Sequence, residues 1–195
     1  MPRFSETEKE NIRQKLLTEG ERLFVVHGLK KVTIDDLVDA AKIAKATFYT
    51  FYDSKEYLYL DIVQVIQQKI FIELQILLEN NTDLPGRERV KQVFAKMSQL
   101  MTNSPILSQI DPTIVDLISR KVSKERMMTF TQQNIDAAQS LHNHGVRFTC
   151  EVRIASMIFQ MLYRCFINLP AGNPEEQALA MDLMLCGIID KIIIE

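Results

Sequence analysis

The chain has 195 residues, of which 47% are hydrophobic and 25% are charged. These proportions are ordinary for a folded soluble protein and exclude a mainly disordered chain. The formal net charge of -2 excludes a protein that is basic throughout, but it permits a local basic surface that binds nucleic acid. The three cysteines, Cys150, Cys165 and Cys186, lie far apart, so we expect no disulfide framework or zinc ribbon and a reducing cytoplasm.

Neither a targeting segment nor a membrane span is predicted. The N-terminal residues lack the apolar run of a signal peptide. The longest uncharged stretch of the most apolar segment runs from Ile154 to Tyr163. It is well short of the roughly 20 residues that a membrane-spanning helix needs. We therefore expect a cytoplasmic protein with no membrane partner.

Almost every segment has apolar residues at helical spacing, and no stretch alternates like a strand bounded by a tight turn. Ser5 precedes Glu8, and Thr33 precedes Asp36, at the spacing of a capping box that starts a helix. The sequence predicts an all-α fold of about nine helices. The expected helices cover residues 6–27, 34–41, 45–51, 55–79, 86–103, 105–120, 124–144, 150–168 and 174–193.

The most informative stretch is residues 33–56, TIDDLVDAAKIAKATFYTFYDSKE. Leu37 and Ala41 share a face of one short helix, and Phe48 and Phe51 share a face of the next. Two such helices can pack at a steep angle across a turn of a few residues. The second helix then exposes groups suited to a DNA major groove, namely Lys45, Ala46, Tyr49 and Thr50.

An ordinary helical hairpin that binds nothing is the alternative interpretation of this stretch. Four of the five residues from Phe48 to Tyr52 are aromatic, which is more than a small core requires. We therefore expect some of these aromatic side chains to contact a partner.

In this region the sequence resembles the TetR family of transcriptional regulators. The family pattern has a helix ending in F-x-x-x-G, then T-[VI]-x-x-[IL], then an aromatic-rich recognition helix and [SN]-K-[ED]-x-L. The matching residues are Phe24, Gly28, Thr33, Ile34, Leu37, Val38, Ala41, Ile43, Lys45, Ala46, Thr47, Phe48, Tyr49, Phe51, Tyr52, Ser54, Lys55, Glu56 and Leu58. The rest of the chain agrees with the family only in its length and its helical pattern.

The resemblance implies a helix-turn-helix over residues 32–51, inside a DNA-binding domain of residues 9–69 whose last helix is a connector. Residues 70–195 would then form an effector-binding and dimerisation domain. Double-stranded operator DNA is the implied partner. Thr33, Tyr49 and Lys55 are implied to contact phosphates. Base edges or sugars would be contacted by Lys45, Ala46, Thr47 and Thr50, with Lys45 able to reach a guanine.

The chain also departs from the family pattern. Lys42 stands where the turn glycine is usual, which costs roughly 1 kcal/mol if the backbone there is left-handed. Ala44 replaces the Ser or Thr that caps the recognition helix, a loss of about 1 kcal/mol. Ala46 and Thr50 alter the base-reading surface, so relatives do not reveal the operator sequence. The acidic residues Asp35, Asp36 and Asp39 are expected to face away from DNA.

Two apolar faces on the last helix indicate a homodimer. Leu179, Leu183, Cys186, Ile189 and Ile193 form one face, and Met181, Met184, Ile188 and Ile192 form another. One core in a chain of this size rarely covers both faces. We therefore expect the helices over 150–168 and 174–193 to pair with their copies in a homodimer, as the resemblance implies. A tightly wrapped monomeric core is the alternative.

Adaptable apolar residues on the middle helices predict a pocket for a small, mainly apolar effector. The candidates are Ile70, Leu74, Phe94, Met97, Met101, Met127, Phe130, Phe159 and Tyr163. The alternative is that these residues are core. For any single residue the core is the better interpretation, and the resemblance favours a pocket for the set.

No catalytic, metal or cofactor site is expected. His142 and His144 are two residues apart, which puts them on different faces of a helix, and no P-loop, GxSxG or HExxH motif is present. The sequence thus predicts a repressor released from its operator by a small molecule, and no enzyme. One alternative is the same regulator controlled by a protein partner. The other is a helical ligand-binding protein or enzyme with an incidental N-terminal hairpin.

Overall fold

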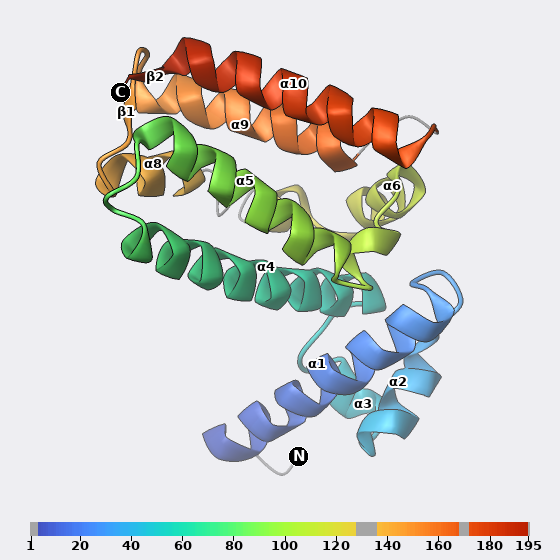
Figure 1. The fold of residues 1–195 in the computed structure, drawn as a ribbon. Helices are drawn as coiled ribbons and strands as arrows, with labels where there is room; N and C mark the ends of the chain where they lie inside the picture. The colour runs from blue at the N-terminus through green and yellow to red at the C-terminus, as the bar shows by residue number, and fades with distance from the viewer. Residues whose placement is uncertain (1–3, 128–135, 168–171, 195) are drawn as a thin grey trace. The chain divides into compact units, whose positions relative to one another are not determined.

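The computed structural model describes residues 4–127, 136–167 and 172–194, without the side chains of residues 136, 137, 163, 164, 166, 167 and 174 (Figure 1). The fold is all-α, as predicted. The chain forms two compact units. The N-terminal unit comprises residues 1–68 and 104–124, and the C-terminal unit comprises residues 69–103 and 125–195. Residues 104–124 thus cluster with the N-terminal unit, although they were expected in the effector-binding domain. The division into a DNA-binding domain up to residue 69 and an effector-binding domain from residue 70 stays a prediction.

The N-terminal unit contains α1 (Glu6–His27), α2 (Ile34–Ala41), α3 (Lys45–Phe48), the first part of α4 (Lys55–Asn80), the 3-10 helix η1 (Leu107–Gln109) and α6 (Pro112–Lys121). Both predicted capping boxes are present, at Ser5 with Glu8 and at Thr33 with Asp36. The predicted bounds of α1 and α2 are confirmed, because capping signals at both helix starts are local in sequence.

Two predicted helices of this unit are too long. The helix expected over 105–120 is a 3-10 turn followed by α6, because Asp111 is extended before Pro112 and its carboxylate caps a new helix. The helix expected over 45–51 ends at Phe48. There the amide and the hydroxyl of Thr50 both donate to the carbonyl of Thr47, which closes a tighter turn.

The N-terminal unit has a core of its own. Phe24, Leu37, Phe48 and Leu58 are fully buried, and they come from four successive helices. Gly20 lets α1 approach α4 closely, because a Cβ atom there would lie 3.1 Å from side-chain carbons of Leu58 and Ile62. This packing holds α2 and α3 against the longer helices.

The C-terminal unit contains the rest of α4, α5 (Gly86–Thr102), α8 (Asp136–Asn143), β1 (Arg147–Phe148), α9 (Val152–Ile167), α10 (Pro174–Ile192) and β2 (Ile193–Ile194). The two strands pair antiparallel, with Arg147 opposite Ile194 and Phe148 opposite Ile193. Strands of two residues are too short to show an alternating pattern, so the sequence did not predict them. Residues 124–127 are helical, and the middle of the predicted 124–144 helix lies outside the described residues.

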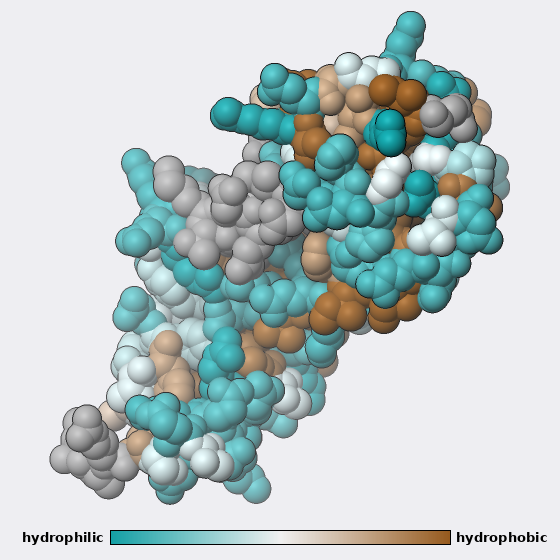
Figure 2. Space-filling view, turned by 90° about the vertical axis from the view of Figure 1, so that its left-hand side faces the viewer, coloured by the Kyte–Doolittle hydropathy of each residue, from teal (hydrophilic) through white to brown (hydrophobic). Residues whose placement is uncertain are grey.

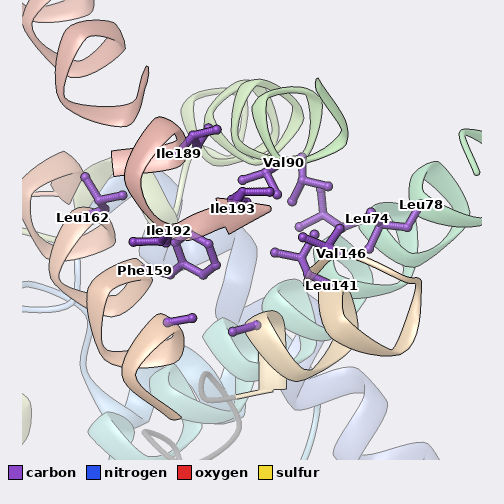
Figure 3. Close-up of a cluster of buried hydrophobic side chains, with 13 residues drawn as sticks. Leu74, Leu78, Val90, Leu141, Val146, Phe159, Leu162, Ile189, Ile192 and Ile193 are labelled. Atoms are coloured by element: carbon purple, nitrogen blue, oxygen red, sulfur yellow. The ribbon is translucent and has the colours of Figure 1, made fainter. Parts of the chain in front are cut away.

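The core of the C-terminal unit draws side chains from α4, α5, α8, α9, α10 and β2 (Figure 3). Its members include Leu74, Val90, Phe159, Ile189 and Ile193. Hydrophobic residues also reach the surface, in patches among hydrophilic residues (Figure 2). Within the described part of the chain, no helix is long and apolar enough to cross a bilayer.

Candidate DNA-binding site

The turn between α2 and α3 places Lys42 in the left-handed backbone region, with φ 56° and ψ 49°. The Ile43 amide donates to the Val38 carbonyl at 3.0 Å, and the Lys42 amide donates to the Asp39 carbonyl at 3.3 Å. These bonds satisfy two carbonyls of the last turn of α2, those of Val38 and Asp39, where the chain turns toward α3. The position is therefore one where the usual glycine is strain-free and lysine is strained.

The start of α3 lacks a side-chain cap. Ala44 occupies the N-cap position with an extended backbone, and no side-chain hydrogen bond caps the helix. The Thr47 amide donates to the Ala44 carbonyl at 2.8 Å. A helix of four residues is not stable by itself, so α3 depends on the packing of its side chains.

Phe48 and Tyr52 supply that packing. Phe48 is fully buried, Tyr52 is 7% exposed and Phe51 is half-buried, whereas Tyr49 is 51% exposed. The rings of Phe48 and Tyr49 meet edge to face, with centroids 5.7 Å apart. The aromatic cluster therefore divides between core and surface, and Tyr49 is its member that a partner can reach.

A polar network missed by the sequence analysis holds Tyr52. Its hydroxyl donates to Asp61 Oδ2 at 3.1 Å, and Arg13 Nη2 donates to the same oxygen at 3.1 Å. Burial raises the pKa of Tyr52, so the hydroxyl stays a neutral donor. The network ties α1 and α4 to the turn after α3. Asp61 is 9 residues from Tyr52 and 48 residues from Arg13, so no local sequence pattern indicated this network.

Thr33, which is expected to contact a phosphate, uses its hydroxyl and its backbone amide within α2. Its hydroxyl and its backbone amide donate to Asp36 Oδ2 at 2.7 and 2.8 Å, and the hydroxyl accepts from the Asp36 amide at 3.2 Å. The bonds from Thr33 hold the pKa of Asp36 below its ordinary value. A phosphate at Thr33 must therefore compete with this carboxylate.

Lys55 joins the start of α4 to the segment before α2. Its Nζ donates to the carbonyls of Val32 at 2.6 Å and of Lys30 at 3.2 Å. An ammonium has three hydrogens, so one remains after these two bonds. Lys55 thus has a structural role, since it holds the segment before α2, and its phosphate contact stays a prediction.

Lys45 forms an ion pair with Asp35. Its Nζ lies 2.8 Å from Asp35 Oδ1 and 3.0 Å from Oδ2, and both side chains are more than half exposed. The bond to Asp35 raises the pKa of the Lys45 ammonium. Asp35, which was expected to face away from DNA, thus lies beside a predicted base-reading residue. The two residues are ten positions apart on different helices, so only the packing of α2 against α3 brings them together.

The other predicted base-reading residues lie around Lys45 on α3 and the turn after it. Ala46 and Thr50 are exposed and Thr47 is half-buried. The Thr50 hydroxyl donates to the Thr47 carbonyl at 2.7 Å, which fixes the orientation of its methyl group. Contact of these side chains with DNA stays a prediction.

Five of the candidate pocket residues lie in or beside the core of the C-terminal unit. Leu74 and Phe159 are buried core members, and Ile70, Phe94 and Met97 pack against them. Met101 is buried and Met127 is half-buried. Phe130 and the side chain of Tyr163 lie outside the described residues. The assignment of these residues to an effector pocket stays a prediction.

A groove of about 470 Å³ lies between α5 and α10. Phe94 and Met97 line it together with Glu88, Lys91, Gln92, Ala95, Ser98, Leu162, Gln177, Ala178, Met181, Asp182 and Leu185. Across the described residues, no group of three or more His, Cys, Asp or Glu side chains is placed to hold a metal ion.

The comparisons with known proteins agree with this geometry. Residues 16–62 match the family model of the bacterial regulatory proteins of the tetR family. A TetR-family regulator from Syntrophomonas wolfei has a TM-score of 0.63 at 17% identity, over 93% of this chain and 94% of that chain. The TetR-family repressor AlkX from Dietzia sp. strain DQ12-45-1b has a TM-score of 0.62 at 17% identity, over 93% and 97%. A third, from Mesorhizobium loti, has a TM-score of 0.59 at 15% identity, over 95% and 96%. No curated protein matches the chain.

An all-α fold with an exposed helix-turn-helix on a supporting helical core defines a DNA-binding transcriptional regulator. The match over residues 16–62 contains α2, α3 and the start of α4. Residues 16–62 therefore match the DNA-binding region of the TetR family, and the chain as a whole shares its fold with solved TetR-family regulators.

Proposed function

We propose that the protein is a homodimeric repressor that acts in the cytoplasm and leaves its operator when it binds a small, mainly apolar effector. DNA binding is supported by the fact that α3 and the turn after it have one buried side and one exposed side. Phe48 and Tyr52 are buried, whereas Lys45, Tyr49 and Thr50 are exposed. A short helix anchored from behind can enter the major groove with its N-terminal residues toward the bases.

DNA titrations test this part of the proposal. Tyr49→Ala should weaken binding to every duplex, because phosphate contacts carry no sequence information. Thr50→Ala should change the preference among duplexes selected from a random library. Thr18→Ala, an exposed threonine on α1, is the matched control and should change neither. Unchanged affinity and preference in the Tyr49 and Thr50 variants contradict the assignment.

Exposed apolar side chains on α9 and α10 support the homodimer. On α9, Ile154, Met157 and Met161 recur at helical spacing and are 45–59% exposed. On α10, Leu179 and Leu183 are 61% and 65% exposed. Contact of these apolar side chains with water is unfavourable, and an exposed apolar patch of this kind is typical of an interface between proteins.

The dimer surface on α10 is smaller than the sequence predicted. Ile189 and Ile193 were expected on the same face as Leu179 and Leu183, but they are buried in the core of their own chain. The end of α10 turns into β2, which pairs with β1, so this end faces the core. We propose the first part of α10, together with α9, as the dimer surface.

Light scattering tests the dimer. Leu183→Glu and Met161→Glu should give monomers at micromolar concentration, because each puts an unpaired charge into a dry interface. Ile72→Glu is the matched control, since Ile72 on α4 is 58% exposed and lies outside the proposed surface. A wild-type monomer, or dimers that persist in both variants, contradicts the proposal.

The groove between α5 and α10 supports the effector. Phe94, Met97, Met181 and Leu185 give it an apolar lining, while charged side chains such as Lys91 also border it. Apolar lining with a few polar groups is typical of small-molecule sites, and methionine adapts to differently shaped guests. The groove uses the face of α10 that carries Met181. Met181 is two residues from Leu179 and from Leu183, or about 200° around the helix axis, so the groove lies on roughly the opposite face of α10. The groove therefore stays accessible in the proposed dimer. AlkX, of the same fold, is a repressor implicated in the biodegradation of n-alkanes.

Decanol, decanoate and decyltrimethylammonium test the effector site, because they share a chain and differ in the charge of the head group. At least one should release operator DNA, and Phe94→Ala should weaken its binding about tenfold. The operator should weaken ligand binding by the same factor, as linkage requires. Ile76→Ala, exposed on α4, is the control. If none of the three releases DNA, or if Phe94→Ala has no effect, this groove is not the effector site.

A further inference from the structure

The ion pair between Asp35 and Lys45 lies at the N-terminal ends of two helices. Asp35 is the second residue of α2, and Lys45 is the first residue of α3. The exposed fractions of their side chains are 67% and 51%. The N-terminal residues of a recognition helix are those that reach base edges, so the carboxylate of Asp35 is held at the surface that the proposed function brings to DNA.

Attraction to phosphates does not account for this carboxylate. Residues 28–58 contain as many acidic residues as lysines, namely Asp35, Asp36, Asp39, Asp53 and Glu56 against Lys30, Lys31, Lys42, Lys45 and Lys55. Asp35 cancels the charge of the lysine at the start of α3 and so weakens attraction to the DNA backbone. An exposed ion pair also adds little to folding stability. The pair therefore needs another explanation.

A G·C base pair has the complementary arrangement of donors and acceptors. In the major groove guanine presents the acceptors N7 and O6, and cytosine presents the N4 amino donor. The N4 donor and O6 are joined by a Watson–Crick hydrogen bond of about 2.9 Å. The distances from Lys45 Nζ to the two oxygens of Asp35 are 2.8 and 3.0 Å. An ammonium over O6 and N7 can thus stand beside a carboxylate that accepts from N4.

We propose that Asp35 is a specificity-determining residue, which reads one G·C pair per half-site by accepting from cytosine N4 while its partner Lys45 donates to guanine. This inference rests on the proposed DNA-binding function. Reversing the base pair places the guanine acceptors against the carboxylate, which repels them. Replacing it by T·A keeps the donor N6 for the carboxylate, but it leaves Lys45 one acceptor in place of two and sets the acceptor N7 of adenine beside the carboxylate. Both changes should weaken binding.

Selection from a random duplex library, followed by titration of the selected sequence and its single-pair variants, tests the proposal. The wild-type protein should discriminate against the other three pairs at one position about 5- to 100-fold. Asp35→Asn should lose this discrimination and keep that at other positions. Asp39→Asn is the matched control, because it removes the same charge from an exposed residue of α2 that is no partner of Lys45. It should keep the wild-type preference.

The outcomes separate this proposal from the function on which it rests. If Asp35→Asn selects the same sequence with the same discrimination, the proposal is overturned and the DNA-binding function stands. An equal loss of affinity for every duplex, with a lower melting temperature, marks a structural role and also overturns it. A wild-type protein that prefers no duplex overturns both. Loss of discrimination at one G·C position, with an unchanged melting temperature, supports it.

Discussion

Replacing Lys42 by glycine should stabilise the N-terminal unit, because this residue adopts φ 56° and ψ 49°. A side chain in the left-handed region costs about 1–2 kcal/mol, which glycine avoids. Glycine also gives the unfolded chain more freedom, which offsets about 0.4–1 kcal/mol of that gain. We therefore expect the Gly variant to be about 1 kcal/mol more stable than the Ala variant.

The comparison of Lys42→Gly with Lys42→Ala isolates the backbone effect, since both variants lose the same ammonium group. For a chain of this length, about 1 kcal/mol corresponds to a difference of roughly 2–4 °C in the melting temperature. Circular dichroism at matched protein concentration measures it, because dimerisation makes the melting temperature depend on concentration. The two variants should bind operator DNA with similar affinity. Equal melting temperatures, or a more stable Ala variant, would refute the assignment of strain to this turn.

Three further substitutions test the supports of the helix-turn-helix. Gly28→Ala should lower the free energy of unfolding by about 1–3 kcal/mol, because Gly28 has φ 77° and ψ 154°, a backbone region open almost only to glycine. Urea unfolding measures this change. No atom lies within 4 Å of a Cβ placed at Gly28, so an unchanged stability would show that the backbone there relaxes to another conformation. Ala44→Ser should add about 1 kcal/mol by capping α3, and Ala44→Val, which cannot cap, should not. Lys55→Met should lower stability by about 1–3 kcal/mol, because the carbonyls of Lys30 and Val32 lose a charged donor; a loss of DNA affinity without a loss of stability would assign Lys55 to phosphate binding alone.

Local signals in the sequence predicted the all-α fold and the helix-turn-helix. The capping boxes at Ser5 and Thr33 join residues three apart, so they are visible in the sequence and present in the structure. Two departures from the family pattern, at Lys42 and at Ala44, pointed to a strained turn and a missing cap, and the structure has the left-handed backbone and the uncapped helix start at these positions. The two helices that were predicted too long also end for local reasons. Pro112 begins a new helix, and the Thr50 hydroxyl donates to the Thr47 carbonyl in the turn after α3, although the apolar residues there keep helical spacing.

Partners that lie far apart in the sequence were decided by tertiary structure alone. The sequence predicted that Lys45 is exposed and did not predict that Asp35 holds it, because the angle between α2 and α3 sets that distance. It placed Leu183 and Ile189 on one apolar face, whereas the pairing of β2 with β1 and the packing of the core leave the first exposed and bury the second. Periodicity tells which residues share a face of a helix. Which part of that face is covered depends on where the neighbouring elements end, and that is a property of the assembled core.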